Sequence, residues 1–89
     1  MTTKTLTDLY HYFDSLFDQD ASQDTLFASS YVRGFIAVEA VAFGDDNQLL
    51  SAELYQQVLT KMNAAKTELS PQDRTIVENF YQKIKVYFT

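Results

Sequence analysis

Few side chains in this sequence are suited to metal binding or acid–base chemistry, and they are scattered. His11 is the only histidine, and cysteine is absent. Three carboxylates lie near the histidine at helical spacing: Asp8, Asp14 and Asp18. A zinc or di-iron site in a helical bundle needs several such ligands projecting inward. Because the helical period puts these side chains on the polar face, we predict a solvated surface there, with a weak surface cation site as the alternative.

The segment 44–54 is similar to the end of a calcium-binding EF-hand loop, but its spacing is wrong. Placing Glu53 at the twelfth loop position puts Ala42 and Gly44 where the first and third ligands belong. Only Asp46 and Glu53 are then able to coordinate calcium. We therefore predict no calcium site in this segment.

Covalent catalysis is also disfavoured by the residues present. A Ser, Thr or Lys nucleophile needs a neighbouring base, and the sole histidine has no evident route to one. The carboxylates do not form a pair on an expected inner face, where a general acid and base would work. We predict no catalytic residues, no cofactor and no metal, and expect that the protein is not an enzyme.

Arg33 is the most unusual charged residue, because it interrupts an apolar stretch beside Gly34 and keeps its charge even when buried. We expect it to pair with an acid of another helix, either Asp73 or Glu78. Asp73 is favoured, because its place at a helix start fixes its position. Exposure to water, or contact with an anion or a protein partner, are the alternatives. The neighbouring Tyr31 belongs to the core or to an interface, with the core favoured.

The composition indicates that helices must position these side chains. The chain has 89 residues, of which 46% are hydrophobic, with two glycines and one proline. So few turn residues disfavour a β-sandwich, and the apolar content is too high for a disordered chain. A chain of this length buries about two thirds of its unfolded surface in one small core. We predict a single domain over residues 1–89.

Four segments are predicted as helices from their apolar spacing and their capping residues. The first follows a cap at Thr5 and places Leu6, Leu9, Phe13 and Leu16 on its apolar face. The second covers about 24–43 after a cap at Ser22 or Asp24, the third covers about 52–66 after a cap at Ser51, and the fourth covers about 71–87. Short loops between helices are typical of bundles. The predicted architecture is a compact antiparallel up-down four-helix bundle with a nearly all-apolar second helix.

The second helix has apolar residues on nearly every side, which is typical of a central helix. Gly34 in its middle costs about 1 kcal/mol relative to alanine. With Ser30 and Ala37 it forms a strip of small residues that would allow another helix to approach closely. Gly44 is suited to end the helix. Any apolar surface left uncovered on this helix would have to meet a partner.

The fourth helix has a strong start signal in the segment 68–73. Ser70 is suited to cap the first free N–H groups, and Pro71 sits at the first helical position, where a missing N–H costs nothing. Asp73 is expected to complete a capping box and to favour the positive end of the helix dipole. These three residues therefore have a structural explanation.

Two blocks, Leu26–Gly34 (LFASSYVRG) and Glu68–Asp73 (ELSPQD), give the chain a family resemblance. At these blocks it resembles the YfcL-like family of small gammaproteobacterial proteins. The resemblance implies a bacterial, cytoplasmic, all-helical protein without an established activity. It singles out six family-like positions: Tyr31, Arg33, Gly34, Ser70, Pro71 and Asp73. Only Tyr31 and Arg33 among them lack a purely mechanical explanation.

Charge and hydropathy limit the expected partners and location. The net charge is −5, with nine acids and two bases in residues 1–53 and three acids and five bases in residues 54–89. This balance argues against nucleic acid as the main partner. No uninterrupted apolar run approaches 18 residues, and the N-terminus lacks the apolar stretch of a signal peptide. We therefore expect a cytoplasmic protein that does not bind membranes.

These observations lead to two functional hypotheses. The first is a non-enzymatic protein-interaction module that binds an unidentified partner, or a second copy of itself, through apolar and aromatic surface around the central helix. The second is a helical protein that binds a small ligand or an anion, with Arg33 as its charged contact.

Overall fold

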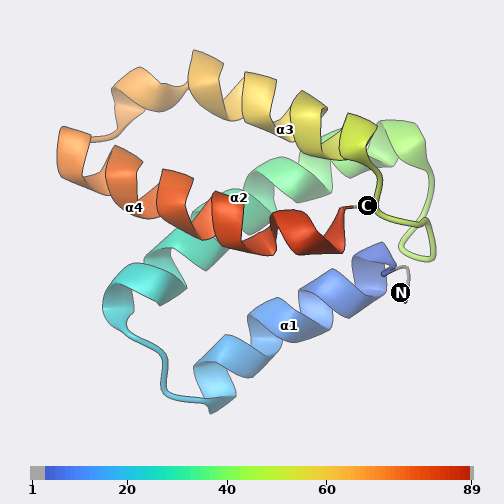
Figure 1. Cartoon of the computed structure of the whole chain (residues 1–89), viewed down its shortest axis with the longest axis horizontal. Helices are drawn as coiled ribbons and strands as arrows, with labels where there is room; N and C mark the ends of the chain where they lie inside the picture. The colour runs from blue at the N-terminus through green and yellow to red at the C-terminus, as the bar shows by residue number, and fades with distance from the viewer. Residues whose placement is uncertain (1–3, 89) are drawn as a thin grey trace.

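The computed structural model describes residues 4–88 as an all-helical fold. Its elements, in order, are α1 (Leu6–Asp18), α2 (Gln23–Ala40), the 3-10 helix η1 (Val41–Phe43), α3 (Ala52–Ala64), the 3-10 helix η2 (Lys66–Glu68), α4 (Pro71–Lys83) and the 3-10 helix η3 (Ile84–Tyr87). Consecutive α-helices alternate in direction, and α2 crosses behind α4 (Figure 1). The predicted all-α bundle is confirmed.

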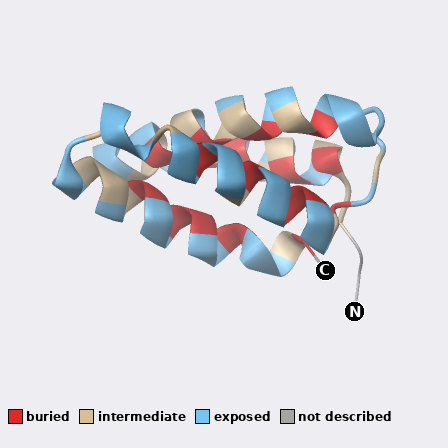
Figure 2. Cartoon of the chain, turned by 90° about the horizontal axis from the view of Figure 1, so that it is seen from above, coloured by how far each residue is buried: buried red, intermediate tan, exposed pale blue. Residues whose placement is uncertain are grey.

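The core is built from one face of each helix, so that buried positions turn inward along all four (Figure 2). In α1 the four residues expected at the core are all buried: Leu6, Leu9, Phe13 and Leu16. The helix α2 contacts α1, α3 and α4, whereas α3 and α4 approach each other less closely. The expectation that the second helix is central is therefore correct.

One face of α2 and η1 nevertheless remains uncovered in the described chain. Val38 is 70% exposed and Val41 is 77% exposed. The strip of small residues lies on this face, because Ser30, Gly34 and Ala37 are all exposed. Apart from its chain neighbours and the backbone of its own helix, no described residue has an atom within 4 Å of a Cβ built on Gly34. No helix of residues 4–88 uses the close approach that this strip of small residues would allow.

Residues Gln23–Phe43 form one helical stretch of 21 residues that is long and apolar enough, by length and composition, to cross a membrane. The sequence criterion of an uninterrupted apolar run missed it, because Arg33 and Glu39 interrupt the run. A core helix of a soluble protein meets the same length and composition criterion. The stretch contributes buried residues to the core, and α2 contacts three other helices.

The loop between η1 and α3 caps the start of α1. Gly44 ends η1 with a φ of 133°, a conformation that favours glycine. The Leu6 N–H donates to the Gln48 carbonyl and the Thr7 N–H donates to the Asp46 carbonyl, each at 3.0 Å. These bonds satisfy N–H groups that lack partners within the helix. The segment 44–50 thus serves α1 as a structural loop.

Candidate functional site

The start of α4 agrees with the sequence prediction except at one side chain. Ser70 accepts a hydrogen bond from the Asp73 N–H at 3.2 Å, and Pro71 occupies the first turn. The Asp73 carboxylate makes no return bond to Ser70, so the predicted capping box is incomplete. A complete box forms instead at α1, where Thr5 and Asp8 bond reciprocally.

Arg33 pairs with α1 rather than with α4, so the predicted pair with Asp73 is wrong. Its Nη1 donates to Asp14 Oδ1 at 2.8 Å, and its guanidinium lies 4.7 Å from the centre of the Tyr10 ring. The two paired side chains are 39% and 62% exposed. An apolar helix can carry this charge because the long side chain reaches the surface beside α1. Such an exposed pair contributes at most about 1 kcal/mol.

The region around His11 shows no metal site. Among the residues 4–88, no group of three or more His, Asp or Glu side chains is placed to hold a metal ion. One of the carboxylates near His11, that of Asp14, is engaged by Arg33.

A groove of about 650 Å³ lies between α3 and α4, and we define it as the α3–α4 groove. This volume falls within the range of small-molecule sites in proteins. Its lining runs from Tyr55 to Asn63 on α3 and from Arg74 to Gln82 on α4, about two helical turns or about 12 Å on each helix. Its floor and walls include four aliphatic or sulfur-containing side chains and three tyrosines: Leu59, Met62, Leu69, Val77, Tyr31, Tyr55 and Tyr81.

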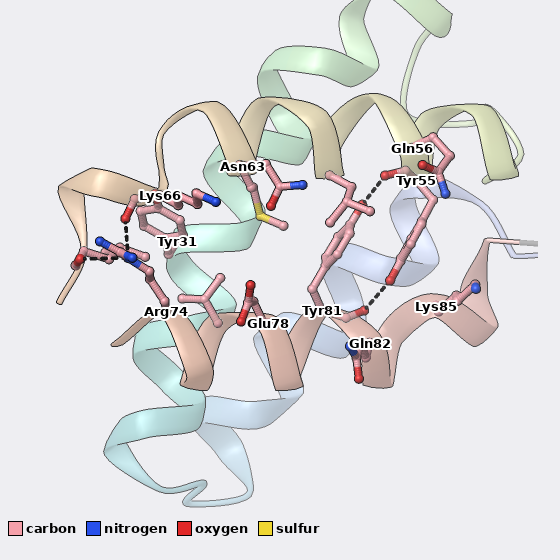
Figure 3. A pocket seen from close by; sticks show the side chains of 14 residues that line it. Tyr31, Tyr55, Gln56, Asn63, Lys66, Arg74, Glu78, Tyr81, Gln82 and Lys85 are labelled. Atoms are coloured by element: carbon pink, nitrogen blue, oxygen red, sulfur yellow. Dashed lines mark hydrogen bonds between the residues drawn. The ribbon is translucent and has the colours of Figure 1, made fainter. Parts of the chain in front are cut away.

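Toward one end of the groove, a reciprocal pair of tyrosines connects α3 and α4 (Figure 3). The rings of Tyr55 and Tyr81 are stacked, with centroids 4.3 Å apart and planes 9° apart. The Tyr81 hydroxyl donates to the Tyr55 carbonyl at 2.8 Å, and the Tyr55 hydroxyl donates to the Tyr81 carbonyl at 3.4 Å. Burial raises the pKa of both tyrosines. This end joins α3 to α4 with all its hydroxyl groups bonded.

The opposite end carries Tyr31, Lys66 and Arg74, which come together from α2, η2 and α4 (Figure 3). Arg74 Nε donates to the Lys66 carbonyl at 2.8 Å and to the Leu69 carbonyl at 3.2 Å. These bonds fix the guanidinium at the groove and hold the turn before α4. Its terminal nitrogens make no hydrogen bond to the described residues.

The Tyr31 hydroxyl is buried at this end without a partner. Its oxygen exposes less than 1 Å² and makes no hydrogen bond within residues 4–88. The ring packs between Phe27 and Phe35, with centroids 6.2 Å and 5.1 Å away. Burial, with a smaller contribution from the charge of Glu68, raises the pKa of Tyr31. A buried polar group without a partner is uncommon in folded proteins and calls for an explanation.

The groove is positively charged in a protein of negative net charge. Lys66, Arg74 and Lys85 line it, against a single acid, Glu78. Across residues 4–88 the only ion pair within 4.0 Å is that of Arg33 with Asp14. The three groove cations are therefore not paired with carboxylates of the described chain.

Comparison with known proteins gives a family. A family model described as YfcL protein matches residues 4–86, nearly the whole chain. The chain belongs to the YfcL protein family. No curated protein matches it, and no solved structure does. The resemblance seen in the two sequence blocks is confirmed.

The six positions singled out in this YfcL family member do not form one site. Tyr31 lines the groove, whereas Arg33 lies beside α1 and Gly34 lies on the uncovered face of α2. The other three shape the start of α4: Ser70, Pro71 and Asp73.

Sequence reasoning missed Arg74 and Tyr81. Arg74 gave no sequence signal, because a single arginine in a first helical turn is ordinary. Tyr81 did have a signal, since Val77, Tyr81 and Ile84 follow the helical spacing of four and three residues. All three are buried.

Proposed function

We propose that this YfcL family member is a non-enzymatic binding protein whose α3–α4 groove takes a small organic molecule with an apolar body. The observation that carries the proposal is the groove itself. It has a volume of about 650 Å³, apolar side chains along its floor, and unpaired polar and charged groups around them. Small-molecule sites commonly combine an apolar lining with a few placed polar groups.

In this proposal Arg33 is not the charged residue that contacts the ligand. Arg33 is engaged by Asp14 and stacks on Tyr10, and it does not line the groove. Lys66, Arg74 and Lys85 are the cations that line the groove. No acid–base or nucleophilic constellation accompanies them among the described residues, which supports binding rather than catalysis.

The same proposal places the protein in the cytoplasm. The apolar helix α2 contacts three other helices and contributes Val32, Ile36 and Ala40 to the core. These contacts support a helix that is used inside a soluble fold.

An amide NMR titration with octan-1-ol, a neutral amphipathic probe, tests the groove. We expect saturable shifts concentrated on α3 and α4. The variant Asn63→Trp places an indole on an exposed position that lines the groove, and it should abolish these shifts. Asn79→Trp is the matched control, because Asn79 is exposed on α4 but does not line the groove. Shifts confined to another surface, or equal effects of the two variants, would refute the proposal.

A second candidate function is protein interaction through the uncovered face of α2 and η1. It is supported by Val38 and Val41, which expose most of their surface on one helical stretch. Sedimentation velocity would test self-association through this face. If the chain sediments as an oligomer, Val38→Asp should convert it to a monomer, whereas Val86→Asp, a change at an equally exposed valine of η3, should not.

A further inference from the structure

The two ends of the α3–α4 groove differ in what their polar groups are bonded to. At the Tyr55 and Tyr81 end, both hydroxyls donate to backbone carbonyls. At the Tyr31 end, the hydroxyl has no acceptor, and the terminal nitrogens of Arg74 have none among the described residues. Donors without acceptors are therefore concentrated at one end.

We propose that this end is an oxyanion subsite, formed by Tyr31, Lys66 and Arg74, and that the groove takes an amphipathic carboxylate with its acid group there. The inference rests on the proposed function, because it specifies the polar end of the molecule that the groove takes.

Charge complementarity supports a carboxylate. An arginine fork bonds a carboxylate with two parallel N–H groups, and such charge-assisted bonds are stronger than neutral ones. The Nε of Arg74 is used by carbonyls of the preceding turn, which holds the guanidinium in place while its terminal nitrogens are free to donate. Lys66 adds a second positive charge at the same end (Figure 3).

Tyr31 supplies a neutral donor. Burial and the nearby charge of Glu68 raise its pKa, so the hydroxyl keeps its proton at neutral pH and can donate to an oxygen. Glu68 is exposed and weakens the attraction for an anion, but two cations oppose it. Because the hydroxyl exposes almost no surface, a ligand oxygen reaches it by displacing a side chain. Lys66 lines this end of the groove, and its long, exposed side chain has room to move.

The other end of the groove is a poorer site for the acid group. Lys85 lies 5.7 Å from the centre of the Tyr55 ring, so its charge is directed at that ring. The two tyrosine hydroxyls nearby already donate to carbonyls. The apolar chain of the ligand therefore lies toward this end, over Met62 and Val77.

Amide NMR titrations with octanoate and octan-1-ol near pH 7 test the subsite. Octanoate is ionised at this pH, so the two probes differ in the charged head group. We expect octanoate to bind the groove at least about 10-fold more tightly than the alcohol. Tyr31→Phe and Arg74→Gln should each weaken the affinity for octanoate about 10-fold and leave the affinity for octan-1-ol unchanged. Arg33→Gln, which removes a cation outside the groove, should affect neither probe.

The outcomes separate the two proposals. Equal affinity of acid and alcohol at the groove would overturn the oxyanion subsite and leave the groove as a binding site. Groove shifts with neither probe would overturn the proposed function and the subsite with it. Because Arg74 also holds the turn before α4, Lys66→Gln is a second variant that removes a groove charge without removing those bonds. An octanoate affinity unchanged by both Tyr31→Phe and Lys66→Gln would also overturn the subsite.

Discussion

The two ends of the α3–α4 groove differ in whether their tyrosine hydroxyls have hydrogen-bond partners within the described chain. Tyr55 and Tyr81 stack at 4.3 Å and each donates its hydroxyl to the other's backbone carbonyl, whereas the buried Tyr31 hydroxyl makes no hydrogen bond within residues 4–88. The same residue type thus has two different uses within one groove. A satisfied buried network stabilises the fold, while an unsatisfied buried donor costs free energy unless something outside the chain accepts from it.

The largest effect is expected for Tyr81→Ala. Tyr81 is 1% exposed, and its removal leaves a cavity and separates α3 from α4 at the satisfied end. We expect the free energy of unfolding to fall by about 3–5 kcal/mol, measured by urea denaturation. A loss below about 1 kcal/mol would show that this end does not hold the helices together.

Tyr81→Phe isolates the hydroxyl from the ring. It keeps the stack but removes the donor at 2.8 Å from the Tyr55 carbonyl. Because the carbonyl is then left buried without that bond, we expect a loss of about 1–3 kcal/mol in the same denaturation experiment. An unchanged free energy of unfolding would show that the Tyr81 hydroxyl does not stabilise its end of the groove.

Alkaline pH should destabilise the protein through these tyrosines. Burial raises the pKa of Tyr81 above its ordinary value near 10, so the folded state keeps a proton that the unfolded state releases. The stabilisation is therefore complete below about pH 10 and is lost as the pH rises above it, by up to about 1.4 kcal/mol per pH unit per tyrosine. Tyr81→Phe should make this loss shallower when stability is measured between neutral and alkaline pH. If the free energy of unfolding fell equally steeply with pH in Tyr81→Phe, the raised pKa of Tyr81 would be contradicted.

Tyr31→Phe is expected to have the smallest effect on stability, and in the opposite direction. It removes a hydroxyl that makes no hydrogen bond to the described residues, and it leaves the packing with Phe27 and Phe35 intact. We expect no loss, or a gain of up to about 1 kcal/mol, in urea denaturation. The contrast with Tyr81→Phe measures the difference between the two ends directly. A loss as large as that of Tyr81→Phe would show that the Tyr31 hydroxyl is satisfied in solution.

Local rules predicted the helix starts and the first core face well. Thr5, Ser22, Ser51 and Ser70 all cap helices, because a side-chain oxygen needs only the next turn of backbone to bond. The buried face of α1 followed directly from its period. Ser22 was one of two candidates, the other being Asp24, and the structure selects the serine.

Contacts between distant segments were predicted less well. The helical period indicates that the charged group of Arg33 needs a partner or water, but it does not indicate which neighbouring helix supplies the partner. Arg33 pairs with Asp14 of α1 instead of Asp73. The groove itself had no sequence signal. It exists because α3 and α4 each pack more closely on α2 than on one another.

The sequence by itself determined the all-helical class, the caps and the family, because these depend on spacing and on residues a few positions apart. Only the tertiary structure decided which acid pairs with Arg33, which face of α2 stays uncovered, and that Tyr31, Lys66 and Arg74 share one end of a groove. These depend on how far apart packed helices settle. That spacing is set by side chains from all the helices at once, and no single segment encodes it.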